Sequence, residues 1–143
     1  MSFTLDVKAF CDKAKKNPET VMRAVSMSLF SEIIYESPVD TGRFKLNWQA
    51  SGPTPRTGTL SGVDPTGNGA VASMQTYITN SSQWQEFTLT NNLPYANVIE
   101  FGGYPGDGPN TIGGYSRQAP RGLVRVNIDR FNTLLNEEAA KVK

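Results

Sequence analysis

The hydrophobic positions of the chain first follow a helical period. Asn17 offers a capping side chain, Pro18 has no N–H to leave unpaired at a helix start, and Glu19 places an acid in the first turn. The apolar residues that follow form one wide stripe, composed of Met22, Val25, Leu29, Phe30, Ile33 and Ile34. Pro38 disfavours a helical residue before it. We therefore predict that the main core helix lies between Asn17 and Pro38.

A shorter amphipathic helix is predicted ahead of it, in DVKAFCDKAKK. Val7, Phe10, Cys11 and Ala14 recur there at helical spacing. We expect Cys11 to be a small buried hydrophobe on the core face, because no neighbouring residue in the sequence would favour its thiolate. As the single cysteine, it cannot form an internal disulfide.

The pattern changes after Gly42 from helical to alternating. Apolar residues then occupy every second position, namely Phe44, Leu46, Trp48 and Ala50. This alternation predicts a half-buried strand that contains Trp48 on its core face. A second strand is predicted in QWQEFTLTNN, with Phe87 and Leu89 on one face and the turn-forming pair Asn91-Asn92 at its end.

Three further segments carry weaker periodic signals. The segment VASMQTYI fits a short helix or an edge strand, and PYANVIEFGG has the leading proline and closing glycines of a short helix. The end of the chain predicts a helix, because its apolar residues share one face: Val124, Ile128, Phe131, Leu134 and Leu135. Residues 121–127 also alternate, so strand and helix both remain open there.

Two segments contain too few hydrophobic residues to build a core. Residues 51–70 and 103–118 are rich in Gly, Pro, Ser and Thr, and we expect extended loops. Self-burial in such loops cannot offset an ordering cost of about 1–2 kcal/mol per residue. We therefore expect both loops to be mobile in the isolated protein and ordered against neighbouring subunits.

The order of these elements predicts an α+β fold. We expect residues 1–143 to form a single domain in which N-terminal and C-terminal helices pack on an antiparallel sheet. The two Gly/Pro-rich loops would extend from this core.

The composition argues against several classes of function. Fourteen Lys and Arg against thirteen Asp and Glu give a net charge of +1, so no strong field is available to bind a nucleic-acid backbone. No histidine is present, which excludes Ser-His-Asp and Cys-His catalysis and most zinc sites. An enzyme would need carboxylates, Lys, Tyr or a bound metal. There is also no leader pattern and no apolar run long enough to span a bilayer, which predicts a soluble protein made in a cytoplasm.

The triplet Asp40-Thr41-Gly42 is the one found at the catalytic carboxylate of aspartic proteases. In those enzymes it follows an apolar strand, so that two carboxylates meet across a dimer axis. Here a predicted helix precedes the triplet, and Arg43 and Phe44 follow it in place of a small residue. The supporting Thr111-Ile112-Gly113 is a poor match. We favour a connector in which Asp40 and Thr41 accept backbone N–H bonds and Gly42 supplies a positive φ.

Other candidate sites are weaker. The run GGYPGDGPNTIGG lacks the Lys-Ser/Thr of a phosphate-binding loop, and Asp64, Asn68 and Asp107 offer too few oxygens for a calcium cage. Glu100 has no recognisable partner carboxylate, so a turn or interface hydrogen bond is the favoured role. Trp48, Trp84 and Tyr95 could stack on bases, but packing is favoured for them. We therefore expect no catalytic residue, no cofactor and no metal.

Three segments together resemble a known family. They are a helix that runs into PVDTGRFKLNW, then LTNNLPYANVIEFGG, then QAPRGLVRVNIDRF ahead of a final helix. The combination, over about two thirds of the chain, resembles the tail-completion or neck family of tailed bacteriophages, of the lambda minor tail protein Z type. The residues that match are Asp40, Thr41, Gly42, Asn92, Pro94, Tyr95, Ala96, Glu100 and Gly102.

The resemblance implies a structural role with no enzymatic activity. It implies that copies form a ring, expected to be a hexamer, at the head-tail junction of the virion after assembly in the host cytoplasm. The implied partners are the connector or stopper proteins, the tail-terminator protein, and phage DNA that passes through the lumen without sequence-specific binding. Tyr95 and Phe101 are candidate interface residues, because aromatic side chains concentrate binding energy. The alternatives are a tail-terminator ring protein and, less well supported, a small aspartic-type protease.

Overall fold

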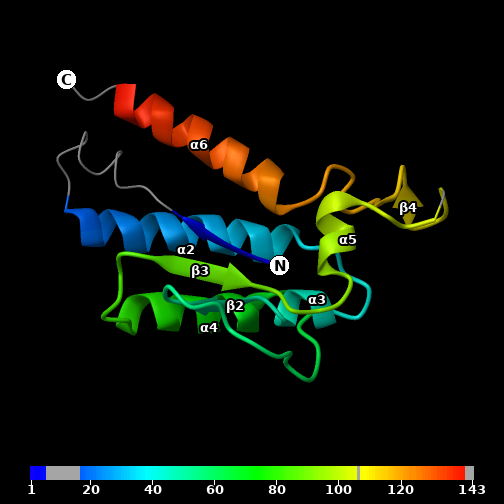
Figure 1. The fold of residues 1–143 in the computed structure, drawn as a ribbon, viewed down its shortest axis with the longest axis horizontal. Helices are drawn as coiled ribbons and strands as arrows, with labels where there is room; N and C mark the ends of the chain where they lie inside the picture. The colour runs from blue at the N-terminus through cyan, green and yellow to red at the C-terminus, as the bar shows by residue number, and fades with distance from the viewer. Residues whose placement is uncertain (6–16, 106, 141–143) are drawn as a thin grey trace.

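A three-stranded antiparallel sheet carries helices on its apolar face, and a small hairpin projects from one end (Figure 1). The computed structural model describes residues 1–5, 17–105 and 107–140 of the 143. Its elements are β1 Ser2–Leu5, α2 Pro18–Glu36, α3 Arg43–Leu46, β2 Gln49–Ser51, α4 Asn68–Asn80, β3 Phe87–Thr90, α5 Ala96–Phe101, β4 Thr111–Ile112, β5 Tyr115–Ser116 and α6 Val124–Ala140. The predicted α+β class is confirmed. The helix predicted around Cys11 lies outside the described residues.

The sheet has one apolar and one hydroxyl-rich face. Its order is β1-β3-β2, and Phe3 and Ala50 both pair with Leu89 of the central strand. Directly paired residues point to the same side, so these three share the core face. Thr88 and Thr90 point to the opposite face, where their partners on β1 and β2 are Ser, Thr and Gln. The strand predicted in QWQEFTLTNN is confirmed over Phe87–Thr90, whereas β1 was not predicted.

Helix α2 forms as its sequence predicts. The Asn17 side chain caps the helix by accepting a hydrogen bond from the Thr20 amide at 3.2 Å. The helix ends at Glu36, before Pro38. Its apolar stripe packs on the sheet, where Phe30 meets Phe3 edge to face at 5.5 Å.

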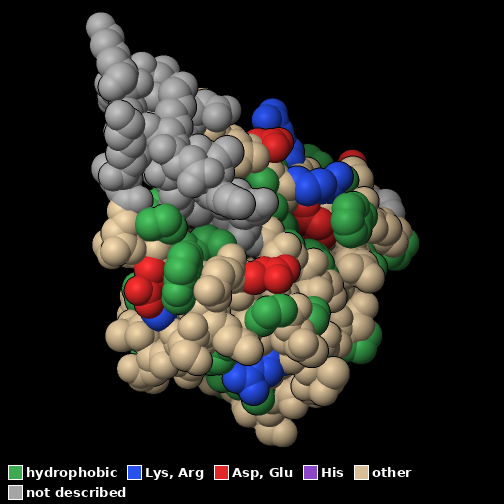
Figure 2. All heavy atoms as spheres, turned by 60° about the vertical axis from the view of Figure 1, so that its left-hand side comes forward, with side chains coloured by type: hydrophobic (Ala, Val, Ile, Leu, Met, Phe, Trp, Pro, Cys, Tyr) green, Lys and Arg blue, Asp and Glu red, His purple; other side chains and the backbone are tan. Residues whose placement is uncertain are grey.

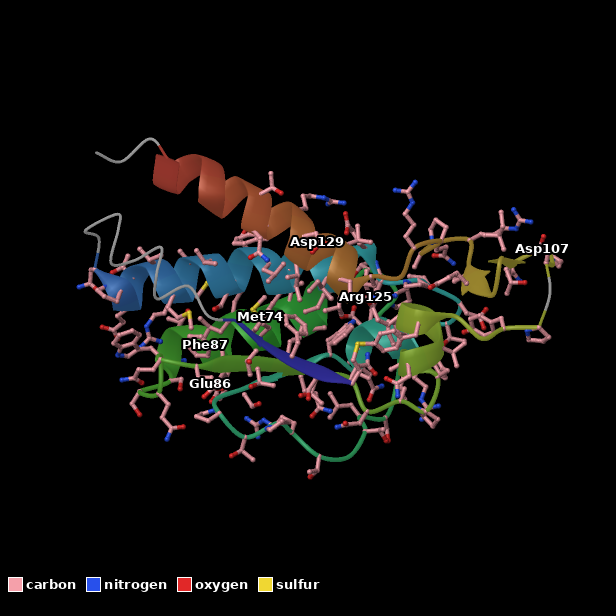
Figure 3. All side chains as sticks on the ribbon, turned by 45° about the horizontal axis from the view of Figure 1, so that its top comes forward. Met74, Glu86, Phe87, Asp107, Arg125 and Asp129 are labelled. Carbon is pink, nitrogen blue, oxygen red and sulfur yellow. The ribbon has the colours of Figure 1, made fainter. Side chains whose placement is uncertain are left out.

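Helix α4 lies beside α2 on the same face of the sheet. Tyr77 of α4 meets Phe87 of β3 edge to face at 6.3 Å, and Met74 is buried between helix and sheet (Figure 3). The ambiguous segment VASMQTYI is therefore helical, within Asn68–Asn80.

The strand predicted directly after Gly42 is wrong over most of its length. Residues 43–46 form the short helix α3, and strand β2 begins only at Gln49. Two polar positions of the alternating pattern, Lys45 and Asn47, are buried as well: Lys45 is 7% exposed, and its ammonium donates to the Tyr35 carbonyl at 2.8 Å. Trp48 is in the core as predicted. The alternation arose from a helical turn whose polar side chains satisfy backbone groups.

The first predicted loop is shorter and better anchored than its composition suggests. Helix α4 takes over at Asn68, so residues 52–67 remain between β2 and α4. The fully buried Asn47 accepts from the Leu60 amide at 2.7 Å and donates to the Leu60 carbonyl at 3.2 Å. Asn92 donates to two further loop carbonyls, those of Arg56 and Gly58, at 2.9 Å each. These contacts tie the loop to the rest of the chain at Arg56, Gly58 and Leu60. Its mobility in the isolated protein stays a prediction.

The second predicted loop is not structureless. It contains the hairpin of β4 and β5, in which Thr111 pairs with Ser116. The alternating segment 121–127 is also settled, because α6 begins at Val124. Glu36 of α2 holds α6 by accepting from Asn127 at 2.7 Å and from Arg130 at 3.2 Å.

Candidate functional site

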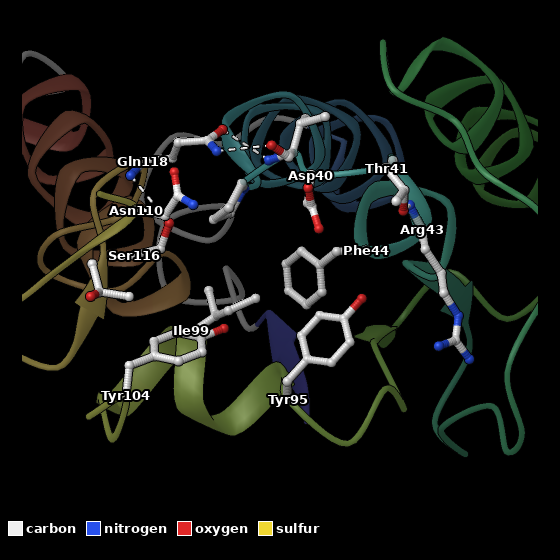
Figure 4. Close-up of a pocket in the computed structure, with 14 residues that line it drawn as sticks. Asp40, Thr41, Arg43, Phe44, Tyr95, Ile99, Tyr104, Asn110, Ser116 and Gln118 are labelled. Atoms are coloured by element: carbon white, nitrogen blue, oxygen red, sulfur yellow. Dashed lines mark hydrogen bonds between the residues drawn. The ribbon is translucent and has the colours of Figure 1, made fainter. Parts of the chain in front are cut away.

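The three segments that carry the family resemblance each contribute residues to one cleft (Figure 4). Residues 38–44, which follow α2, line it from one side, and Tyr95 and Ile99 of the PYANVIEFGG segment line it from another. The hairpin segment completes it with Asn110 and Gln118, among others. We call this the Asp40 cleft, and its volume is about 480 Å³.

Gly42 sets the path of the chain into the cleft. Its φ is 98°, in the left-handed region that favours glycine. A Cβ at this position would lie 2.5 Å from the backbone nitrogen of Pro65, and the Asp64 amide donates to the Gly42 carbonyl at 3.0 Å. The predicted positive φ is confirmed, and close approach of another backbone segment gives a second reason for glycine.

Asp40 does not brace the turn as predicted. Thr41 does so, because its hydroxyl accepts from the Arg43 amide at 3.2 Å. The exposed carboxylate of Asp40 makes no hydrogen bond or ion pair with any described residue and points into the cleft (Figure 4). Gln118, which sequence reasoning missed, fixes the neighbouring Val39 instead, through bonds to its amide at 2.8 Å and its carbonyl at 2.9 Å.

Tyr95 forms an aromatic wall of the cleft. Its ring lies 5.9 Å from that of Phe44, so it is partly packed and partly available. Partial burial raises the pKa of the Tyr95 hydroxyl; the charge of Arg43 opposes this shift, and Tyr104 and Asp40 add to it. Tyr95 is therefore a neutral phenol at physiological pH, with a hydroxyl close to both charges.

The asparagine pair before Pro94 has an architectural role. Asn91 donates to the Phe44 carbonyl at 2.9 Å and accepts from the Leu93 amide at 3.2 Å. Asn92 holds the loop, as described above. The pair thus links β3 to α3 and to residues 52–67. Helix α5 then begins at the buried Ala96.

Glu100 is the most strongly bound side chain of the segment. It is 1% exposed, and its carboxylate accepts from the amides of Leu123, Val124 and Arg125 at 2.7, 2.6 and 2.9 Å. The Arg125 side chain adds an ion pair at 2.8 Å. Burial alone would raise the pKa of Glu100, but these bonds outweigh it and hold the pKa below its usual value.

These contacts make Glu100 the cap of α6, supplied by a different helix. A carboxylate at a helix N-terminus satisfies amides that have no partner in the helix and interacts favourably with the helix dipole. Gly122 allows the approach, since its φ is 85° and a Cβ there would lie 2.4 Å from the Glu100 carbonyl oxygen. The expected hydrogen-bonding role of Glu100 is therefore observed within the chain.

The end of α5 carries the exposed apolar groups of this region. Gly102 ends the helix with φ 83°, and the amides of Gly103 and Tyr104 then bond to the hairpin carbonyl of Gly114. Phe101 is 59% exposed and lies under the Arg125 guanidinium at 4.7 Å from the ring centre. Ile112, on the hairpin, is 41% exposed.

Within residues 1–5, 17–105 and 107–140, no group of three His, Cys, Asp or Glu side chains is placed to hold a metal ion. No helix in the described part of the chain is long and apolar enough to cross a membrane. On the face shown in Figure 2, charged side chains are scattered among polar ones and form no continuous basic patch. Comparisons with protein-family models, with curated proteins and with solved structures find no match to this chain.

Proposed function

We propose that this chain is a structural protein of the neck of a tailed bacteriophage. In this proposal, copies form a ring that completes the tail and joins it to the DNA-filled head. The ring is expected to contain six copies, to contact the connector or stopper proteins and the tail terminator, and to surround the DNA path. Assembly would take place in the host cytoplasm and the product would remain in the virion.

One observation carries the proposal: Gly42, Asn92 and Glu100, three residues of the family resemblance, occupy structural positions in the fold. Gly42 permits a backbone crossing, Asn92 anchors a loop, and Glu100 caps a helix with every carboxylate oxygen engaged. A carboxylate that already accepts four hydrogen bonds is poorly suited to proton transfer. These residues support a precise shape, as an assembly protein requires.

Exposed apolar side chains supply a surface for contacts with neighbouring subunits. Phe101 ends α5 and Ile112 belongs to β4, and both elements lie at the end of the molecule from which the hairpin projects (Figure 1). Closed rings need heterologous contacts, in which one patch meets a different patch on the next copy. The net charge of +1 gives little counterion-release affinity, which suits DNA that passes without sequence-specific binding.

The proposal predicts the phenotype of Phe101→Ala. Because Phe101 is more than half exposed and loses its contact with the Arg125 guanidinium, its removal should change the free energy of unfolding by no more than about 1 kcal/mol. Phage that carry the variant should nevertheless yield separate filled heads and complete tails, counted by electron microscopy of lysates. Tyr35→Ala, which removes an aromatic group that is 47% exposed on α2, is the matched control and should leave virions joined.

Other outcomes of the same experiment identify other functions. Tails of irregular length in the Phe101→Ala lysate would indicate a tail-terminator ring. Empty heads would place the defect in packaging or genome retention. Uncleaved precursor proteins in the Phe101→Ala lysate, if they also accumulate with Asp40→Asn, would indicate that this chain is a protease. Each of these results would contradict the tail-joining role.

A further inference from the structure

The Asp40 cleft combines a free carboxylate with aromatic walls. Asp40 is the only acidic residue that lines it among the described residues, and it has no ionic or hydrogen-bonding partner there. Phe44, Tyr95 and Tyr104 supply rings to the lining. Arg43 lies at the rim, but its side chain extends away from the Asp40 carboxylate (Figure 4). The negative charge in the cleft is therefore not neutralised by direct contact with a described residue.

This combination suits a guanidinium group from outside the cleft. A planar guanidinium can bond both oxygens of a carboxylate and can stack on an aromatic face. The cleft volume of about 480 Å³ exceeds that of one side chain, so an arginine could enter together with its flanking backbone. A small organic ligand is less well matched, because the cleft is open and has few buried polar groups.

One arginine of the described chain is available to supply this guanidinium. Arg23, Arg125 and Arg130 pair with carboxylates, and Arg56 and Arg117 donate to backbone carbonyls. Arg43 belongs to the cleft itself. Arg121 is exposed and has neither a hydrogen bond nor an ion pair with any described residue.

Arg121 is also held in a defined place. It lies between Pro120 and Gly122, where the Gly122 amide donates to the Ala119 carbonyl at 3.1 Å. The following residue, Leu123, is fixed by Glu100 at 2.7 Å. A charged side chain on an ordered turn loses less conformational entropy on binding than one on a loose loop.

We propose that Arg121 of one copy enters the Asp40 cleft of a second copy and pairs with Asp40 against the Tyr95 ring. This pair rests on the proposed ring and specifies its contact, because the turn that carries Arg121 on one copy meets a different surface, the Asp40 cleft, on the next. Arg121 does not line the cleft of its own chain, so the pair is intermolecular. The contact would give each charge a partner that it lacks among the described residues.

A zero-length cross-link tests this contact directly. The variant Arg121→Lys keeps the positive charge and supplies an amine that a carbodiimide can join to Asp40. We expect an isopeptide bond between positions 121 and 40, and mass spectrometry of mixed ¹⁴N- and ¹⁵N-labelled protein should show that it joins two copies. Absence of this cross-link at concentrations where the protein self-associates, or a bond only within one copy, would overturn the inference.

Charge exchange provides the second arm. Asp40→Arg and Arg121→Asp should each weaken self-association about tenfold or more in sedimentation velocity, and the double variant should return to within about threefold of the original. Asp129→Arg, the same change at an exposed α6 carboxylate with no described partner, should have no comparable effect. Single variants that associate normally would refute the pair, as would a protein that stays monomeric at all concentrations.

These results are separable from the proposed function. A ring that persists in Asp40→Arg would refute the pair and leave the neck assignment intact. A closed dimer that contains the 121–40 cross-link would support the pair and contradict the ring.

Discussion

Replacing Glu100 should loosen the attachment of α6 more than any other single change in this region. The carboxylate is buried and receives three backbone amides and the Arg125 guanidinium. In Glu100→Ala these donors lose their acceptor together. In Glu100→Gln one oxygen can still accept, but the amide nitrogen must then face donors.

The magnitude follows from the number of buried donors. Leu123 and Val124 are buried, and each unpaired amide costs about 1–3 kcal/mol. Loss of the charge at the helix N-terminus adds about 0.3–1 kcal/mol. Water that enters the site will recover part of this, so we expect Glu100→Ala to cost about 3–5 kcal/mol. Glu100→Gln should cost roughly half as much.

Urea denaturation followed by circular dichroism measures this loss, and hydrogen exchange at residues 123–125 locates it. The matched control is Glu86→Ala, because Glu86 is exposed and makes no hydrogen bond or ion pair with another described residue. That variant should remain within about 0.5 kcal/mol of the original protein. If Glu100→Ala changed the free energy of unfolding as little as the control does, the capping role would be wrong.

The pKa of Glu100 is lowered in the fold, so the stability that its carboxylate adds should be complete above the unfolded pKa of about 4.3 and lost as pH falls through the lower folded value. Urea midpoints of the original protein should therefore fall between pH 7 and pH 3, and Glu100→Gln should flatten this dependence. Gly42→Ala should destabilise the fold by about 2 kcal/mol or more, because the left-handed φ disfavours Ala and its Cβ would overlap Pro65; a urea midpoint equal to that of the original would contradict this. Asn47→Ala should remove the hydrogen-exchange protection of the Leu60 amide, and slow exchange at Leu60 in that variant would show that the loop is ordered by other contacts.

The helices were predictable where local signals are strong. Asn17 and Pro18 fix the start of α2, and its stripe of apolar residues fixes the buried face, because both signals act within a few residues. The short helix α5 was likewise predicted between Pro94 and Gly102. These features depend on the sequence next to them and not on the rest of the fold.

The errors arose where a distant contact decides the structure. Lys45 and Asn47 looked like the exposed side of a strand, yet each is buried because it bonds to a backbone group elsewhere in the chain. β1 was missed because four residues of alternating pattern acquire meaning only beside β3. The hairpin was hidden in a segment rich in glycine.

The candidate site shows the same division. The positive φ of Gly42 was predicted from the turn it must make. The cap formed by Glu100 was not predicted, because the amides that it binds belong to a helix that starts at Val124. Sequence reasoning also missed that Thr41 and Gln118 make the turn bonds expected of Asp40, whose carboxylate bonds to no described residue. Arg125 and Gln118 give no signal in the sequence that marks them as partners of these segments.

Cryo-electron microscopy of the virions that contain this chain tests the central proposal most directly. We predict a closed ring at the head-tail junction, between the connector stack and the tail terminator, into which the fold of α2, α4 and the three-stranded sheet can be placed. In that ring Phe101 should face a neighbouring subunit, and DNA should pass through the lumen without ordered contacts to its bases. Virions in which the junction is complete and this chain is absent, or is found only elsewhere, would contradict the account.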